Sequence, residues 1–261
     1  MDDLTLRITT VQSALHWEDR GANLAMFSEK LAELAGRTDL VVLPEMFTTG
    51  FSMNAPSLAE PMDGPTMQWL DAQAKAVGAV ITGSFIVVEH GRYYNRLVWM
   101  RPNGYFETYD KRHCFTLAGE HETYTAGNTK RIVELNGWKI CLLICYDLRF
   151  PVWSRNTDGY DLLVFVANWP ETRSHHWSQL LIARAIENQA YAIGVNRTGT
   201  DAKGHTYSGD TAVIDYSGRT QYRVSGTEAV FTVNLSLEGL RAYREKLPFL
   251  ADRDNFKIFD R

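Results

Sequence analysis

The chain contains little cysteine, which limits what its thiols can do. Its 261 residues include Cys114, Cys141 and Cys145, an odd count that does not indicate a disulfide framework. Cys141 and Cys145 lie four positions apart in an expected strand, or about 13 Å at about 3.3 Å per residue. A disulfide needs Cα atoms within about 7 Å, so this pair can neither form one nor share a metal ion. Adjacent His175 and His176 have no second ligand pair at a zinc-type spacing, so we expect no metal.

Long apolar runs and an excess of basic charge are also lacking. No segment approaches the ~18 to 20 apolar residues that span a bilayer, and the acidic start MDDLTLRITT has no signal-type apolar core. The formal net charge is −4 without a basic block, which disfavours nucleic-acid binding. No G-x-G-x-x-G follows an expected strand, which disfavours a dinucleotide site. We expect a cytoplasmic protein without nucleic-acid or membrane partners.

The composition is otherwise that of an ordinary globular protein. Apolar residues make up 45% of the chain and charged residues 22%. The length suffices for a sizeable core, and neither an internal repeat nor a low-complexity linker divides it. We therefore expect one domain over residues 1–261.

Short apolar runs alternate with amphipathic segments, which predicts an α/β fold. The expected strands cover residues 6–12, 39–46, 79–89, 95–100, 105–111, 138–145, 160–169, 190–199 and 229–235, with a further hairpin over 211–224. The expected helices cover residues 21–36, 65–78, 174–189 and 237–248. Turn residues at 101–104 and 216–219 predict hairpins and hence mixed sheets. Since many strands are apolar throughout, both faces of the sheets must be covered.

Three reactive side chains stand directly after expected strands. Glu45 follows LVVLP, Lys111 follows YFETYD, and Cys145 follows KICLLI. In α/β sheets, ligands bind outside the carboxyl ends of strands. The trio suits amide hydrolysis through a thioester, with Cys145 as nucleophile and Glu45 as the proton acceptor. Lys111 would lower the thiol pKa and face the oxyanion beside the backbone N–H of Tyr146.

Several segments, in this order, resemble the nitrilase or carbon–nitrogen hydrolase superfamily. They are LPEMFTTGF, YDKRH, ICYDLRFP, NWP, RAIENQAYAIGVNRTG and YSGDTAVIDYSG. The resemblance implies a Glu–Lys–Cys triad on Glu45, Lys111 and Cys145. It also implies a four-layer αββα sandwich with mixed sheets, no metal or organic cofactor, and association into dimers or larger forms. A second glutamate often supports the lysine in this family, and we prefer Glu120 to Glu122 for that role.

The likeness is strongest to the omega-amidase branch of the superfamily. Those enzymes hydrolyse monoamides of short dicarboxylates, such as 2-oxoglutaramate and 2-oxosuccinamate. Such a substrate keeps a carboxylate and therefore wants a cation in a fixed place. Arg173 is our candidate for that cation. The expected pocket residues are Phe115, Tyr146, Asn168, Trp169 and Arg173.

Other readings remain open from the sequence. The substrate may instead be a nitrile, a carbamoyl compound or another small amide. A papain-like hydrolase would pair Cys145 with His113, His121 or His205, and would tolerate the loss of Lys111. A non-catalytic binding subunit is disfavoured because all three triad positions are filled.

Two neighbours of Cys145 and one long loop carry further expectations. We expect Asp147 and Arg149 to brace the turn after Cys145, with Arg149 paired to Glu187. The loop over residues 53–65 has the length and the proline and glycine content of a segment that covers the site.

Overall fold

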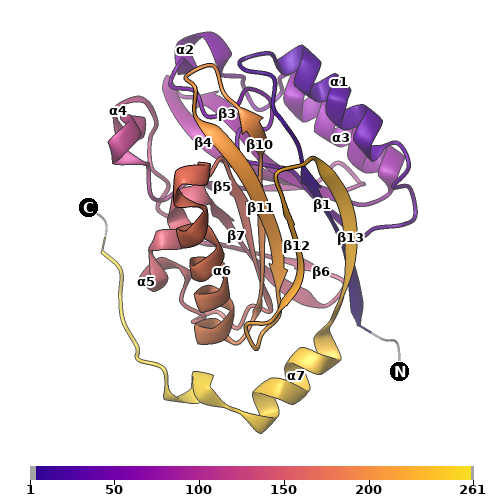
Figure 1. Cartoon of the computed structure of the whole chain (residues 1–261), viewed down its shortest axis with the longest axis vertical. Coiled ribbons are helices and arrows are strands. Elements are labelled where there is room, and N and C mark those ends of the chain that lie inside the picture. Colours follow the sequence, from indigo (N-terminus) through magenta and orange to yellow (C-terminus); the bar gives the residue numbers. More distant parts are fainter. Residues whose placement is uncertain (1–3, 260–261) are drawn as a thin grey trace.

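The computed structural model describes residues 4–259, and within this range the strands form two sheets (Figure 1). One has the order β13-β1-β2-β3-β4-β5. Its strands are β1 (Thr5–Gln12), β2 (Leu40–Val42), β3 (Val80–Glu89), β4 (Arg92–Met100), β5 (Phe106–Asp110) and β13 (Ala229–Ser236). The other has the order β10-β11-β9-β8-β7-β6, with β12 paired to β11. Its strands are β6 (Arg131–Leu135), β7 (Trp138–Ile144), β8 (Leu162–Ala167), β9 (Tyr191–Asn196), β10 (Thr198–Thr200), β11 (Thr206–Ile214) and β12 (Thr220–Ser225).

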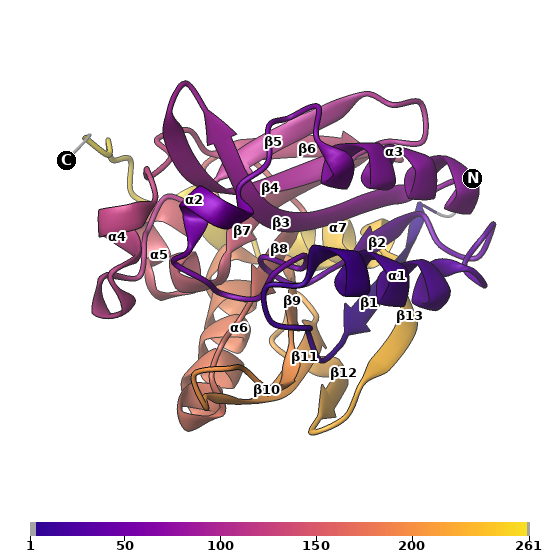
Figure 2. The same cartoon turned by 90° about the horizontal axis from the view of Figure 1, so that it is seen from above.

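Helices cover the outer faces of both sheets, which confirms the four-layer αββα sandwich. The α-helices are α1 (Arg20–Leu31), α2 (Ala55–Leu58), α3 (Pro65–Val77), α4 (Glu120–Thr123), α5 (Pro151–Ser154), α6 (Ser174–Asn188) and α7 (Leu237–Lys246). Helices α1 and α3 lie side by side on the first sheet, while α6 packs on β9 and β11 of the second (Figures 1 and 2). No helix within residues 4–259 is long and apolar enough to cross a bilayer.

Strand alternation decides which side chains fill which layer. In β2, Leu40 and Val42 belong to the core between the sheets, whereas Val41 packs in the cluster beneath α1 and α3. This is the two-residue period of a strand that is buried on both faces. Gly194 in β9 lets α6 approach closely, because a Cβ there would lie 2.4 Å from the Trp177 ring.

Both sheets are mixed, as the expected hairpins require. Strands β1, β2 and β3 run parallel, as do β7, β8 and β9. The hairpins β3–β4, β4–β5 and β11–β12 are antiparallel. Parallel strands end at the same edge of a sheet, so the segments after β2, β7 and β8 can reach one site.

The structure corrects some of the predicted boundaries. The strand expected over 39–46 is only β2, and the one expected over 190–199 divides into β9 and β10. Asn196 divides it because its side chain hydrogen-bonds the carbonyls of Trp169 and Gly209 in place of a regular strand neighbour. The sequence reading missed β6, a five-residue edge strand with only one buried residue. The loop over 53–65 contains the short helix α2.

Candidate active site

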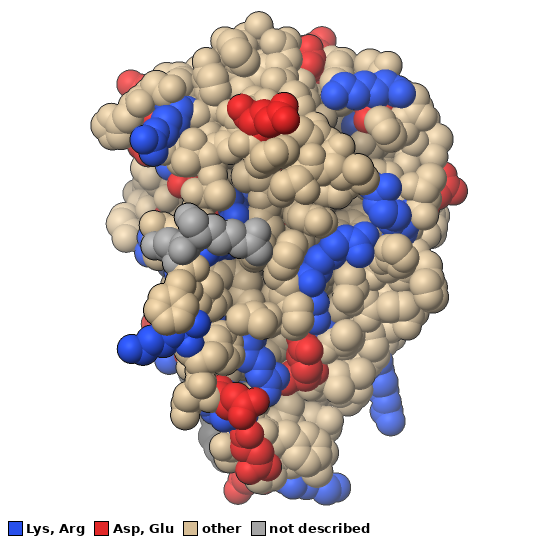
Figure 3. Space-filling model, turned by 90° about the vertical axis from the view of Figure 1, so that its left-hand side faces the viewer, with Lys and Arg blue, Asp and Glu red and all other residues tan. Residues whose placement is uncertain are grey.

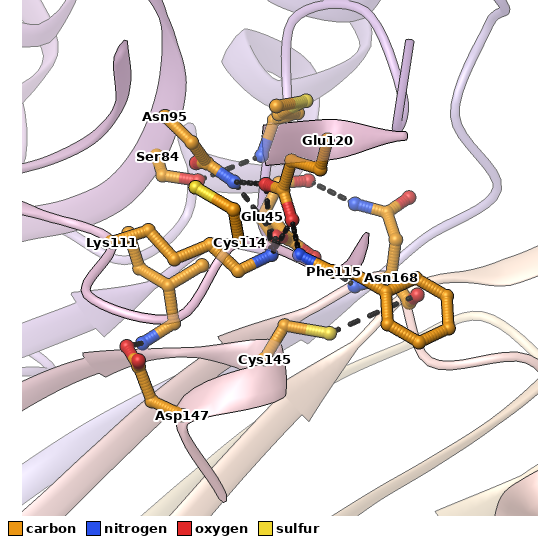
Figure 4. Close-up of polar contacts among 12 residues, drawn as sticks. Glu45, Ser84, Asn95, Lys111, Cys114, Phe115, Glu120, Cys145, Asp147 and Asn168 are labelled. Carbon is orange, nitrogen blue, oxygen red and sulfur yellow. Dashed lines mark hydrogen bonds and ion pairs between the residues drawn. The ribbon is translucent and has the colours of Figure 1, made fainter. Parts of the chain in front are cut away.

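The three predicted residues meet between the two sheets. Glu45 follows β2, Lys111 follows β5 directly, and Cys145 follows β7 directly (Figure 4). Glu45 and Lys111 therefore come from the first sheet and Cys145 from the second. The backbone N–H of Lys111 donates to Asn95 in β4, which fixes the end of the β4–β5 hairpin.

Lys111 is buried between two carboxylates. Its Nζ lies 2.8 Å from Glu45 Oε1 and 2.9 Å from Glu120 Oε2. Asn95 Nδ2 also donates to Glu45, at 2.8 Å, and to Glu120 Oε1, at 3.3 Å. The structure thus brings Glu120 to the lysine, while the exposed Glu122 lies 4.0 Å from His121 on the surface.

The charges in this cluster control one another. Burial alone would lower the pKa of Lys111, but Glu120 and Glu45 hold that pKa well above its usual value. Burial raises the pKa of Glu120; Lys111 opposes this rise and Glu45 adds to it. One ammonium cannot neutralise two buried carboxylates, so the cluster favours holding one additional proton.

Cys145 sits at a strained turn. Its φ of +43° lies in the left-handed region that side chains other than glycine rarely adopt. The strand therefore ends abruptly at Ile144, and the 3₁₀ turn η2 (Cys145–Arg149) begins. Sequence reasoning anticipated a sharp turn here, and the backbone angle confirms it. The Sγ atom lies 4.0 Å from the carbonyl oxygen of Asn168 (Figure 4).

The thiol is protonated at rest, contrary to the expectation that Lys111 lowers its pKa overall. Burial raises the pKa of Cys145 well above its usual value, and Glu45 raises it further, whereas Lys111 acts in the opposite direction. The nearby cation is thus outweighed. A reaction at this sulfur needs a base beside it, and Glu45 is positioned for that role.

Asn168 fixes the second glutamate oxygen. Its backbone N–H donates to Glu45 Oε2 at 2.8 Å, and its side-chain amide donates to the Glu45 carbonyl. The sequence reading placed Asn168 in the pocket but missed Asn95, which lies within a strand and has no motif to mark it.

Cys145 opens into a cavity of about 320 Å³ that contains every predicted pocket residue. These are Phe115, Tyr146, Asn168, Trp169 and Arg173, together with Phe51 and Arg149. The guanidinium of Arg173 lies over the Phe115 ring at 5.6 Å, and that of Arg149 lies over the Trp169 ring at 4.7 Å. Aromatic walls and two cations thus surround the thiol.

Arg149 corrects one expectation and Asp147 confirms another. Glu187 pairs with Arg184 at 2.9 Å and not with Arg149, which faces the cavity and contacts His176. Asp147 does brace the turn, because it accepts the backbone N–H of Ile144 at 3.0 Å.

The three histidines of the papain-like reading have other surroundings. His113 Nδ1 is 2.8 Å from Asp147. His121 lies on α4 beside a different hollow. His205 lines the cavity, but it is largely exposed and lies 3.4 Å from Asp201. Within the described residues, no group of three or more histidine, cysteine, aspartate or glutamate side chains is arranged to hold a metal ion.

Known proteins share this fold and sequence. A family model for carbon-nitrogen hydrolases matches residues 7–245. Omega-amidase YafV of Yersinia enterocolitica is 47% identical over 97% of this chain and 99% of its own. The 2-oxoglutaramate amidase of Bacillus subtilis is 36% identical over 82% of this chain and 84% of its own.

A solved structure agrees closely as well. It is a CN-hydrolase superfamily protein from Xanthomonas campestris with an arsenic adduct in the active site. It superposes with a TM-score of 0.96 at 43% identity, covering 99% of this chain and 100% of that one. Since the family model and these relatives span nearly all of the sequence that builds both sheets and the buried cluster, the chain belongs to the carbon-nitrogen hydrolase family.

Proposed function

We propose that this protein is an omega-amidase that hydrolyses the terminal amide of short dicarboxylate monoamides, 2-oxoglutaramate and 2-oxosuccinamate, to the dicarboxylate and ammonia. The observation that carries the proposal is a thiol beside a buried Glu–Lys–Glu cluster, at a cavity that also holds two arginines. The relatives named omega-amidase and 2-oxoglutaramate amidase support the choice of substrate.

The catalytic residues of this proposal are Glu45, Lys111 and Cys145. Glu45 takes the thiol proton as Sγ attacks the amide carbon. The oxygen of the tetrahedral intermediate receives Lys111 Nζ and the Tyr146 N–H; one such donor is worth about 10² to 10³ in rate. Glu45 passes its proton to the departing nitrogen, and ammonia leaves a thioester on Cys145. Water then attacks the thioester and gives a proton to Glu45, so that the acid product leaves and the thiol re-forms.

Glu120 has a supporting role in the same proposal. It shares Lys111 with Glu45 and accepts the backbone N–H of Phe115. Its raised pKa keeps a proton in the cluster, so that Lys111 can remain an ammonium without two full negative charges around it. No metal or organic cofactor enters the reaction.

The carboxylate that remains on the substrate meets Arg173 and Arg149. Both line the cavity, and both lie over aromatic rings. Such stacking holds a guanidinium plane in place, and a planar guanidinium binds a carboxylate through paired hydrogen bonds. Phe115 and Trp169 form the apolar walls around the short carbon chain.

The alternative within this family is hydrolysis of another small amide, a carbamoyl compound or a nitrile. It keeps the thiol chemistry and gives the two arginines no anionic partner. Ammonia release from 2-oxoglutaramate, from glutamine and from a simple nitrile separates these substrates.

The deciding assay compares the wild-type protein with Cys145→Ala. Release from the keto amide that vanishes in Cys145→Ala supports both the mechanism and the substrate. Cys145-dependent release from another substrate alone keeps the mechanism and refutes the substrate. Equal release by both proteins refutes Cys145 as the nucleophile.

Three broader proposals accompany this function. We propose that residues 1–261 form one domain, because the core between the sheets draws on residues from Leu6 to Leu240. A cytoplasmic location suits the three cysteines, all of which are free thiols in the described chain.

A homo-oligomer, a dimer or larger, suits the exposed apolar side chains on one side of the molecule. Val152 of α5, Ile186 of α6 and Phe259 of the C-terminal segment are exposed. Figure 3 looks onto the side of α4, α5 and the C-terminal segment, where large areas carry no charged residue. Sedimentation velocity would measure the oligomeric state.

A further inference from the structure

A single buried carboxylate, that of Asp147, accepts four hydrogen bonds beside the nucleophile. Oδ2 accepts the backbone N–H of Ile144 at 3.0 Å and the Tyr109 hydroxyl at 2.7 Å. Oδ1 lies 3.0 Å from the backbone nitrogen of His113 and 2.8 Å from its ring Nδ1. Asp147 is completely buried. None of these bonds takes part in the chemistry proposed above.

The four donors come from both sheets. Ile144 is the last residue of β7 in the second sheet, and Tyr109 lies in β5 of the first. Cys145 comes directly after Ile144, and Lys111 is two residues beyond Tyr109. The Asp147 carboxylate therefore bridges the two chain segments whose ends carry the thiol and the ammonium.

The bond to Ile144 acts where the backbone is strained. Cys145 has a positive φ, a conformation that costs of order 1 kcal/mol or more and persists only where its surroundings enforce it. Asp147 lies within the same 3₁₀ turn and accepts the N–H of the residue before Cys145. This contact holds the turn in the conformation that presents the sulfur.

His113 extends the bridge to the next loop. Its ring stacks on Phe150 with centroids 3.7 Å apart and an interplanar angle of 4°. Two residues later, the backbone N–H of Phe115 donates to Glu120, the carboxylate that shares Lys111. The loop that passes Glu120 is thus anchored to Asp147 through both the backbone and the ring of His113.

We propose that Asp147 and His113 are positioning residues that set the separation between Cys145 and Lys111 across the two sheets. The inference rests on the proposed function for its kinetic readout, but not for its chemical readout. A displacement of about 1 Å at such a distance from the chemistry can cost about 10²-fold in rate. His113 thereby gains a role different from that of a papain-like base.

Asp147→Asn tests the bridge with almost no change in size. All four bonds are donated to Asp147, and an amide has only one accepting oxygen. Whichever way the amide lies, its NH₂ faces the backbone N–H of either Ile144 or His113, so one of them loses its acceptor. We expect kcat to fall about 10²-fold while KM stays within about threefold, as when an interaction needed only in the transition state is lost.

Two variants of His113 separate positioning from simple packing. In His113→Asn, the side-chain NH₂ can replace ring Nδ1 as the donor to Asp147, so we expect kcat within about fivefold of wild type. In His113→Ala this donor is lost, and we expect kcat to fall at least about tenfold. His90→Asn, in the exposed turn between β3 and β4, is the matched control and should behave as wild type. All assays are run at a temperature where circular dichroism shows every variant fully folded.

Alkylation of Cys145 by iodoacetamide supplies the readout that needs no substrate. Peptide mass spectrometry measures its rate for Cys145 separately from Cys114 and Cys141. Because Lys111 lowers the thiol pKa, moving the two apart should slow alkylation at pH 8 and shift its pH profile upward in Asp147→Asn and His113→Ala. This result would support the bridge even if wild type hydrolysed none of the tested amides.

Three results would overturn the inference. One is an unchanged alkylation profile in folded Asp147→Asn. Another is a rise in KM with unchanged kcat, which would indicate a substrate-binding role. The third is a defect in His113→Asn as large as that in His113→Ala.

Discussion

Replacing Lys111 by methionine should destabilise the fold and abolish activity together. The ammonium is 1% exposed and bonded to two carboxylates that are completely buried. Methionine fills a similar volume but leaves Glu45 and Glu120 with Asn95 as their shared donor. Breaking a buried ion pair from one side costs about 3 to 5 kcal/mol. At about 2 to 3 °C per kcal/mol for a chain of this size, Tm should fall by about 6 to 15 °C.

The loss should depend on pH with a defined sign. The pKa of Glu120 is already raised in the wild-type fold, and removing Lys111 takes away the influence that lowers it. A carboxyl with a raised folded pKa contributes stability that is full below its unfolded pKa, about 4.3, and is lost as pH rises through the folded value. The Tm difference between wild type and Lys111→Met should therefore be larger at pH 8 than at pH 5.

Differential scanning calorimetry at both pH values measures this difference. Lys75→Met, at an exposed pair with Asp71 on α3, is the matched control and should cost less than about 1 kcal/mol. The double variant Lys111→Met, Glu120→Gln should recover part of the lost stability but none of the activity, since it removes one of the two uncompensated charges. Unchanged stability in Lys111→Met would refute the electrostatic account. Retained ammonia release would refute Lys111 as part of the catalytic machinery.

Three further changes should have separate effects. Arg173→Met should lower kcat/KM for 2-oxoglutaramate about 10- to 100-fold, since a hydrogen bond to a charged group is worth about 1.5 to 3 kcal/mol; a similar loss with an uncharged amide would argue against carboxylate recognition. Gly194→Ala should cost about 1 to 3 kcal/mol in urea unfolding, because its Cβ would lie 2.4 Å from Trp177; an unchanged midpoint would show that α6 can move away. Arg184→Met should cost about 1 to 3 kcal/mol in the same assay, because the Leu148 carbonyl accepts both Nε and Nη2 of this buried arginine; no loss would mean that another donor replaces it.

The sequence revealed the parts of the site that depend on a single strand. An apolar run that stops at a polar residue marks a strand end, and this is how Glu45, Lys111 and Cys145 became candidates. The same pattern, with its turn residues, predicted the hairpins of both sheets. These features are local because the two-residue period of a strand is set by its own backbone.

The sequence could not reveal contacts that depend on how the two sheets stack. Asn95 lies within β4 and bonds Glu45 and Glu120 only because β4 passes beneath both. Arg149 was assigned to Glu187 on charge alone, although Glu187 has a nearer partner one helical turn away on α6. Charge complementarity does not choose among partners until the packing of the elements is known.

The arrangement of this site costs stability, and that cost is informative. Replacing a buried ion group by apolar side chains of similar volume is often neutral or stabilising, so the ends of β2 and β5 would close at least as well without Glu45 and Lys111. Cys145 adds a strained backbone at the end of β7, in the other sheet. Both unfavourable features adjoin one cavity, although they arise in strands that are far apart along the chain. Packing alone explains neither, whereas a reaction that moves a proton from a sulfur and neutralises a developing oxyanion requires both.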